Sequence, residues 1–339
     1  MECVFLNKNK HIYFINSNQI VNAGIKDLFL KYSLNKEIKY EEVNINKDII
    51  KSKIKNLNQI IFEISQNCQL RCAYCVYSDS YKYNRNVSSK LMAFETAKKS
   101  IDYILDFVNN RYKKTFYIGF YGGEPILNFD TIKKIVNYSK EKFKNWDLYF
   151  TITTNGIGLN EEIIHFFIKN SFNIMVSLDG PEENHDAKRI FPDGTGSFKT
   201  VVKNLRKIKK INKDYYLEKV MFSIVYSKDL SIKKMYHFFQ SNDLVNQNTI
   251  KFGFVNALDT DYYKKNLYDE STFSHQLNKI IKKITDKRQK GQNLSPIENQ
   301  FFNEFNTLNK RLENRNFSLL VGACFFDNRL YIDADGVFL

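Results

Sequence analysis

The 339-residue sequence contains little proline, glycine, cysteine or tryptophan, with 4, 13, 5 and 1 residues of each. Scarce proline and glycine beside 43% hydrophobic residues exclude a collagen-like or disordered chain. No apolar run approaches the roughly 20 residues that a membrane-spanning helix needs, and the N-terminus lacks the apolar core of a signal peptide. We therefore expect a soluble, globular, cytoplasmic protein with no membrane partner.

Acidic residues are outnumbered by basic ones, 37 to 51, so the net charge is +14. Much of the excess is lysine scattered along expected helices, without an arginine-rich block or a basic tail. This distribution is typical of a solvated cationic surface and does not favour a nucleic-acid partner. An acidic partner, for instance an acidic peptide, stays open.

Several catalytic motifs are also absent: there is no Walker-type phosphate loop, no His-Glu-x-x-His helix and no Gly-x-Ser-x-Gly elbow. The number of cysteines is odd, which argues against a disulfide framework in a chain without a secretion signal. Three of them fall within eight residues, as Cys68-x-x-x-Cys72-x-x-Cys75. Thiolates so spaced are ligands for an iron–sulfur cluster or for zinc.

Structural zinc needs four ligands, usually two cysteine pairs or a cysteine pair with a histidine pair. No second pair exists here and no histidine lies near the motif. A [4Fe–4S] cluster held by Cys68, Cys72 and Cys75 fits better, because its fourth iron stays open for a substrate. Cys3 lies in an apolar segment and is expected to pack in a core or at a sheet edge.

Strands and helices alternate along the middle of the chain. Segments rich in β-branched and aromatic residues predict six buried strands, at 60–65, 115–121, 148–155, 172–179, 219–226 and 250–257. Segments of helical periodicity predict five helices, at 88–110, 131–144, 161–169, 198–211 and 232–239. This alternation indicates an α/β fold with a parallel sheet and right-handed crossovers.

Polar and glycine-rich motifs follow the first four predicted strands. They are Cys68 to Cys75, Gly122-Gly123-Glu124-Pro125, Thr154-Asn155-Gly156 and Ser177-Leu178-Asp179-Gly180. Ligands of parallel α/β folds bind at the carboxyl ends of the strands, so four motifs at this rim predict one site.

The cysteine motif, with Tyr74 just before Cys75, resembles that of the radical S-adenosylmethionine (SAM) superfamily, and the other rim motifs follow in that family's order. The resemblance implies a partial (β/α)6 TIM-like barrel, a [4Fe–4S] cluster and SAM as cofactors. In that family the reduced cluster cleaves SAM, and the resulting 5′-deoxyadenosyl radical abstracts hydrogen from a substrate.

The resemblance also implies roles for the rim residues. Gly122, Gly123, Glu124 and Pro125 match the segment that binds the SAM amino group. Beside SAM we expect Thr154, Asn155, Ser177 and Asp179, with Arg189 on its carboxylate and Val225 on its adenine. Asn155 and Asp179 could equally be turn formers, and His185 and Asp186 are more typical of loop structure than of a general base.

The two ends of the chain differ from this barrel. We expect an N-terminal appendage at 1–56, with a hairpin of 3–6 and 11–15 and a helix at 25–34, then the barrel at 57–258 and a helical bridge at 259–318. Residues 319–339, with Cys324 and a strand–turn–strand at 330–339, resemble the start of a SPASM or twitch extension. Such extensions hold auxiliary [4Fe–4S] clusters, which Cys324 alone cannot complete, so we expect a truncated sequence.

These resemblances predict a maturase that installs a thioether or carbon–carbon crosslink in a ribosomally synthesised peptide. The implied partners are a precursor peptide, with an acidic leader that the 1–56 hairpin could dock, and a flavodoxin- or ferredoxin-like electron donor. The main alternative is an anaerobic sulfatase maturase that forms formylglycine. An RNA-modifying radical SAM enzyme and a non-catalytic zinc protein are the weaker alternatives. Oxygen sensitivity is expected of an open cluster.

Overall fold

The computed structural model describes residues 3–6, 11–14, 19–22, 54–81, 85–108, 114–257, 260–313 and 329–338. Cys324 and the helix expected at 25–34 lie outside the described residues, as does most of the segment that resembles a SPASM extension. Within the described part of the chain, no helix is long and apolar enough to cross a membrane.

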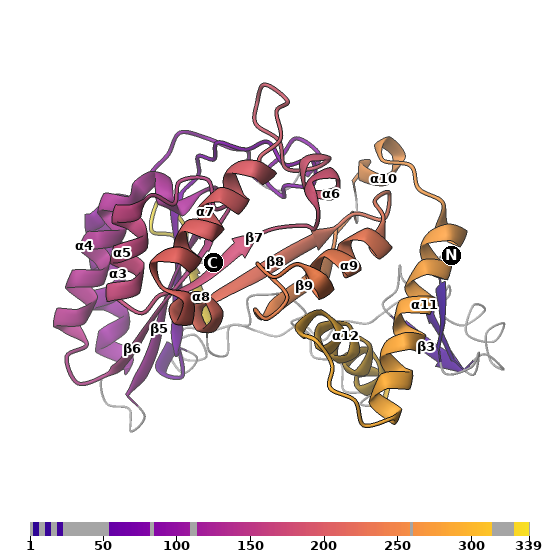
Figure 1. The fold of residues 1–339 in the computed structure, drawn as a ribbon. Coiled ribbons are helices and arrows are strands. Elements are labelled where there is room, and N and C mark those ends of the chain that lie inside the picture. The colour runs from indigo at the N-terminus through magenta and orange to yellow at the C-terminus, as the bar shows by residue number, and fades with distance from the viewer. Residues whose placement is uncertain are drawn as a thin grey trace, which may run out of the picture.

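A curved, parallel sheet forms the centre of the molecule (Figure 1). Its strands are β4 (Gln59–Ser65), β5 (Thr115–Gly122), β6 (Asp147–Thr154), β7 (Asn173–Ser177), β8 (Val220–Tyr226), β9 (Ile250–Phe254) and β10 (Arg329–Ile332). They are hydrogen-bonded in the order β10-β4-β5-β6-β7-β8-β9, and every neighbouring pair is parallel. The predicted α/β class is confirmed.

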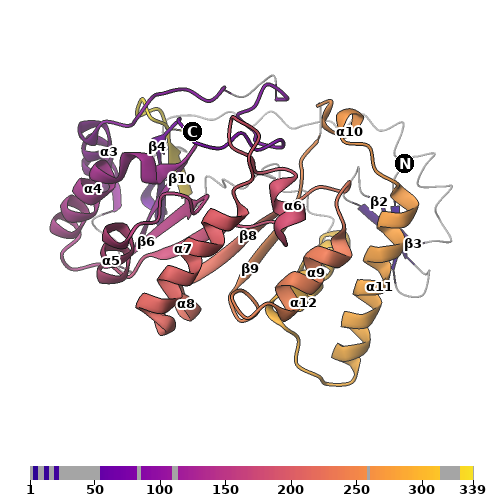
Figure 2. The ribbon, with the colours of Figure 1, turned by 45° about the horizontal axis from the view of Figure 1, so that its top comes forward.

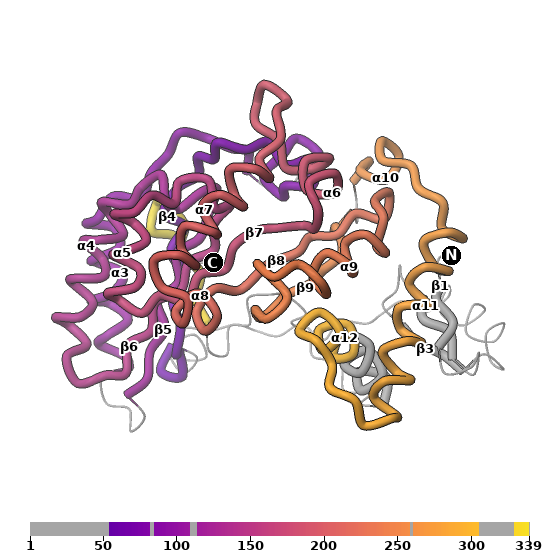
Figure 3. Tube along the Cα trace, viewed as in Figure 1, coloured from indigo at the N-terminus to yellow at the C-terminus, as the bar shows by residue number. Residues whose placement is uncertain are grey.

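Helices lie around the outside of this sheet (Figures 1 and 2). The main ones are α3 (Phe94–Val108), α4 (Phe129–Lys142), α5 (Glu161–Lys169), α7 (Phe198–Ile211) and α9 (Ile232–Ser241). Shorter ones are the 3₁₀ turn η2 (Pro125–Asn128), α6 (Glu182–Asp186) and α8 (Lys213–Lys219). After β9 the chain continues through α10 (Tyr262–Lys265) to the longer α11 (Glu270–Gln289) and α12 (Pro296–Glu313), as Figure 3 traces.

The alternation of buried and half-buried side chains along the strands explains why one face of the sheet is not covered by helices. In β8, Phe222 and Ile224 are buried in the core, whereas Ser223 and Val225, which alternate with them, are only half-buried. Side chains alternate between the two faces of a strand, so the apolar set packs under the helices and the other set faces the concave side. The cavity described below is lined by this concave side at the carboxyl ends of the strands.

Helix α3 begins six residues later than the sequence predicts. Residues before it run beside the end of β4 instead, with an antiparallel bridge between Ser65 and Leu91 and a hydrogen bond from Gln66 N to the Lys90 carbonyl at 2.8 Å. These backbone bonds replace the first helical turn that the Ser-rich start had suggested.

The strand and turn expected at 330–339 are present, and the returning segment makes an antiparallel bridge from Phe338 to Ile332. Beyond that expectation, β10 pairs in parallel with β4, so it is a seventh strand of the main sheet. The pattern of alternating residues predicted the strand but could not identify a partner some 270 positions away.

The N-terminal segments form a separate antiparallel sheet of β1 (Cys3–Leu6), β2 (His11–Phe14) and β3 (Gln19–Asn22). The hairpin of the first two strands agrees with the sequence. β3 was not predicted, because only two of its four residues, Ile20 and Val21, are apolar. β1 lies against α11 and β3 against α12. Figure 2 shows the small sheet, labelled at β2 and β3, near α11.

Candidate cofactor-binding site

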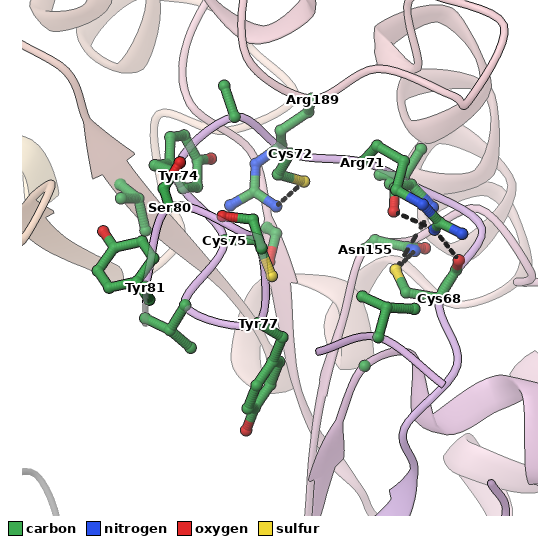
Figure 4. A pocket seen from close by; sticks show the side chains of 18 of the residues that line it. Cys68, Arg71, Cys72, Tyr74, Cys75, Tyr77, Ser80, Tyr81, Asn155 and Arg189 are labelled. Atoms are coloured by element: carbon green, nitrogen blue, oxygen red, sulfur yellow. Dashed lines mark hydrogen bonds between the residues drawn. The ribbon is translucent and has the colours of Figure 1, made fainter. Parts of the chain in front are cut away.

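A cavity of about 830 Å³ opens at the carboxyl ends of the parallel strands. One wall is the cysteine loop, which we define as the described residues of 66–93 between β4 and α3. The opposite wall consists of the ends of β5, β6, β7, β8 and β9. All three cysteines of the predicted motif line this cavity (Figure 4).

The three thiols are half-buried and free, and two of them accept hydrogen bonds. Asn155 Nδ2 lies 3.7 Å from Cys68 Sγ, and Arg189 Nη1 lies 3.8 Å from Cys72 Sγ (Figure 4). Burial raises the pKa of Cys68 to about 12 and that of Cys72 to about 11. Because thiolates are the ligand form, a bound cation is needed to reverse this effect of burial.

The arrangement of the thiols can be tested against the two candidate metals. In the described residues, no three His, Cys, Asp or Glu side chains converge as a single metal ion requires. Thiols from one loop along the wall of a large cavity suit a bulky multi-iron cluster better than a tetrahedral zinc ion. The donors present therefore fit a [4Fe–4S] cluster held by Cys68, Cys72 and Cys75.

Backbone pairing holds the cysteine loop against the segment after α6. Arg71 N donates to the Ile190 carbonyl at 2.7 Å, and Ala73 N donates to the Lys188 carbonyl at 2.9 Å. Cys72 lies between these two anchors, which explains why Arg189, between the two acceptors, meets its sulfur.

Asp179 is buried behind this wall and gathers several donors. Its carboxylate accepts from the hydroxyl of Tyr74, from Arg189 Nε at 2.8 Å and from Val225 N at 3.0 Å. Burial raises the pKa of Tyr74 well above its ordinary value; the charge of Arg189 opposes this rise and the carboxylate of Asp179 adds to it. Asp179 thus fixes two side chains that line the cavity without lining it itself.

The two glycines after β5 allow a close approach of two loops. Gly122 has φ +125°, and a Cβ there would overlap the carbonyl oxygen of Ser65. A Cβ on Gly123 would overlap the carbonyl oxygen of Asn67. Gly123 N donates to the Ser65 carbonyl at 2.6 Å, so the glycine turn packs directly on the segment that precedes Cys68.

Glu124 is fully buried beneath the same turn. Its carboxylate accepts from Thr154 Oγ1 at 2.8 Å, from Asn155 N at 2.7 Å and from Ile126 N at 3.1 Å. Burial raises the pKa of Glu124 to about 7. All of these donors belong to the protein, so in this structure Glu124 holds the end of β6, and with it Asn155, in place.

Most of the cofactor residues inferred from the sequence come together in the cavity. Those that line it are Tyr74, Gly122, Gly123, Thr154, Asn155, Ser177, Arg189 and Val225. Three residues do not line it, namely Glu124, Pro125 and Asp179. Their positions beneath the wall suit a supporting function, whereas contact of the lining residues with SAM stays a prediction.

Other lining residues were missed by the sequence reasoning. They include Tyr77, Tyr81, Tyr121, Ser223, Phe254, Val255 and Asn256. For Ser223 a signal was available, because it is a polar residue between apolar neighbours of a predicted strand. Tyr77 and Tyr81 follow the cysteine motif, where no periodic pattern indicates which side chains point inward.

His185 does not line the cavity, which agrees with the structural interpretation of its loop. Its Nδ1 accepts from Asp179 N at 3.3 Å, and its Nε2 lies 3.0 Å from Ser197 Oγ. Since that hydroxyl donates to the Arg189 carbonyl at 2.7 Å, Nε2 must carry the proton. Asp186 accepts from Phe198 N at 2.8 Å at the start of α7.

Comparisons with known proteins agree with this geometry. The chain is 34% identical over 198 residues to a cysteine-type anaerobic sulfatase-maturating enzyme of Clostridium novyi, covering 56% of this chain and 50% of the relative. It is 27% identical over 297 residues to the radical SAM cyclopropyl synthase TigE of Paramaledivibacter caminithermalis, covering 82% and 57%. The chain thus spans about half the length of these curated relatives.

Solved structures show the same fold at lower identity. A structure named as native anSMEcpe with bound AdoMet and the Cp18Cys peptide matches with a TM-score of 0.61 and 22% identity, over 83% of this chain and 73% of that one. Streptococcus suis SuiB bound to precursor peptide SuiA matches with a TM-score of 0.53 and 17% identity, over 94% and 73%.

A family model described as the radical SAM superfamily matches residues 62–239, which is more than half of the chain. The matched region begins in β4 and ends in α9, so it contains the cysteine loop and strands β5 to β8, whose ends line the cavity. The chain therefore belongs to the radical SAM superfamily.

Proposed function

We propose that this chain is a radical SAM maturase that abstracts hydrogen from a peptide and installs a thioether or carbon–carbon crosslink in it. The observation that carries the proposal is the position of Cys68, Cys72 and Cys75 along one wall of a large open cavity at the strand ends. Cys68, Cys72 and Cys75 would hold the [4Fe–4S] cluster, leaving the remaining volume for SAM and a substrate residue.

When bound and reduced, the cluster would supply the electron for cleavage of SAM to methionine and a 5′-deoxyadenosyl radical. The protein's part is to orient and shield these groups. Asn155 and Arg189 donate toward the sulfurs of Cys68 and Cys72, which stabilises negative charge there. We propose that Gly122, Gly123, Thr154 and the other lining residues inferred from the sequence contact SAM.

For Arg189 we propose contact with the SAM carboxylate. Its Nε and Nη2 are directed to Asp179, and Nη1 lies by Cys72. The pKa of Arg189 is raised well above its ordinary value, because the attraction of Asp179 and other neighbours outweighs the opposing effect of burial. A charged guanidinium fixed in this way is suited to attract the SAM carboxylate without moving.

A peptide substrate is supported by the relatives. SuiB is named as bound to a precursor peptide, and the sulfatase-maturase structure as bound to a peptide. The small sheet of β1, β2 and β3 has edge strands to which an extended leader could add, and the net charge of +14 favours an acidic leader. A flavodoxin- or ferredoxin-like donor would supply the electron.

The second candidate is an anaerobic sulfatase maturase that oxidises a cysteine or serine to formylglycine. It is favoured by the 34% identity to the cysteine-type enzyme of Clostridium novyi. The two candidates share the same SAM chemistry and differ only in the product, so the product decides between them.

The test is anaerobic reconstitution with iron and sulfide, followed by dithionite and SAM, with 5′-deoxyadenosine measured by mass spectrometry. We expect product from the wild type and none from Cys72→Ala, while the matched thiol variant Cys3→Ala keeps it. A colourless protein with one zinc, or product from Cys72→Ala, contradicts the cluster assignment. A crosslinked peptide supports the maturase, whereas an aldehyde in a sulfatase peptide supports the second candidate.

A further inference from the structure

A buried carboxylate next to the cysteine loop takes no part in the chemistry above. Glu63 lies in β4 and is only 2% exposed. One of its oxygens accepts from Arg85 Nε at 2.8 Å. The other accepts from Gln66 Nε2 at 3.0 Å and from the backbone N–H of Ala334 at 3.3 Å. Glu63 therefore joins β4, two parts of the cysteine loop and the turn after β10.

The connection continues from Arg85 into the cavity wall. The Arg85 guanidinium lies 3.7 Å from the centre of the Tyr77 ring, which packs it against the loop. Tyr77 lines the cavity two residues after Cys75. Glu63 is thus connected to the cavity wall through its ion pair with Arg85 and the contact of Arg85 with the Tyr77 ring.

The turn after β10 is also held by contacts that do not involve Glu63. Asp333 Oδ1 accepts from the N–H groups of Asp335 and Val337, at 2.9 and 2.8 Å, which shapes the turn. Gly336 has φ +87°, and a Cβ there would lie 2.8 Å from Thr96 Cγ2 of α3. The turn therefore fits closely on α3 while it presents the Ala334 N–H to Glu63.

The burial of Glu63 makes these contacts depend on one another. A buried carboxylate that loses one of its donors is left with negative charge that the remaining donors compensate less completely. Undocking the turn therefore weakens the ion pair between Glu63 and Arg85. Loss of that ion pair in turn weakens the hydrogen bond from the Ala334 N–H that docks the turn.

We propose that Glu63 is a positioning residue for the cysteine loop, and that it couples docking of residues 329–338 to the order of the wall that carries Cys75. This inference concerns the metal-free protein as well as the loaded one. It can thus be tested without SAM cleavage, and its failure would be distinct from failure of the proposed function.

The first experiment compares Glu63→Gln with Glu298→Gln by hydrogen exchange in the metal-free protein. Glu298 is a matched control, because it is also fully buried and accepts from Lys287, Tyr236, Gln240 and the Ser295 N–H, far along the chain in α12. We expect the amides of Ser78 and Tyr81 to exchange about tenfold faster in Glu63→Gln only. Equal exchange in both variants would overturn the proposal.

The second experiment perturbs the turn rather than the carboxylate. Gly336→Ala should speed exchange of the same two amides and reduce the iron bound after anaerobic reconstitution. Gly291→Ala is the matched control, since Gly291 also has a positive φ, +69°, but a Cβ there meets nothing within 4 Å. If Gly336→Ala loosens only residues 329–338 and leaves the cysteine loop unchanged, the coupling does not exist.

Discussion

Asp179 and Arg189 form a buried ion pair behind the cysteine loop, with Arg189 Nε 2.8 Å from the carboxylate. The exposed fractions of their side chains are 1% and 8%, so water screens the pair little. The pair explains how a cationic group can be held beside Cys72 with one orientation, since the carboxylate takes two of its nitrogens and leaves Nη1 toward the sulfur.

Asp179→Asn is predicted to destabilise the protein by about 3 kcal/mol, because it leaves the Arg189 charge buried without a counterion. Denaturant unfolding of the metal-free protein measures the loss. The control is Glu183→Gln, which removes an exposed ion pair with Lys234 of 2.6 Å and should cost less than about 1 kcal/mol. Similar losses in the two variants would contradict a special contribution of the buried pair.

Gly123→Ala is predicted to displace the segment before Cys68, since the new methyl group overlaps the Asn67 carbonyl oxygen. We expect a stability loss of about 1–3 kcal/mol from the strain and the disturbed backbone hydrogen bonds. Iron content after reconstitution should fall with it. Gly253→Ala in β9 is the control, because a Cβ there meets nothing within 4 Å. Full iron loading of Gly123→Ala would show that the close approach is dispensable.

Buried His185 is predicted to make the free energy of unfolding decrease at acidic pH. Burial lowers its pKa from 6.5 to about 4, so between these values the unfolded chain binds a proton that the folded chain does not. Stability from this group is complete above pH 6.5 and falls as the pH drops toward 4, by up to about 3 kcal/mol.

The measurement is the free energy of unfolding against pH for the wild type and His185→Gln. The slope of the wild type between pH 6.5 and 4 should be steeper than that of His185→Gln. The exposed His165 provides the control, and His165→Gln should keep the wild-type slope. A wild-type slope retained in His185→Gln would mean that the neutral ring is not the source.

The order of strands and helices could be predicted because apolar periodicity is local. Val201, Leu205 and Ile208 share one face of α7 in the sequence and are fully buried in the structure. The cysteine motif was equally visible, since its ligands lie within eight residues. The hydrogen bonds from Tyr74 to Asp179 and from Ala334 to Glu63 could not be predicted. They depend on how segments far apart in the sequence pack, and residue spacing carries no information about such contacts.

The glycine motif shows a second kind of limit. Its position after a strand predicted a site, and that prediction agrees with the cavity lining. The reason for its glycines in this structure is contact with the backbone of Ser65 and Asn67, which only three-dimensional packing reveals.

The parallel pairing of β10 with β4 also bears on the order in which the protein is assembled. Arg329 of β10 pairs with Gln59 of β4. β4 is the first strand of the main sheet to be synthesised, yet its pairing with β10 can form only after the other strands of the sheet have been made. Pairing across so many residues is entropically slow. A nascent chain can thus form most of the sheet early, while the edge that adjoins the cysteine loop is completed only after residue 332 has been synthesised.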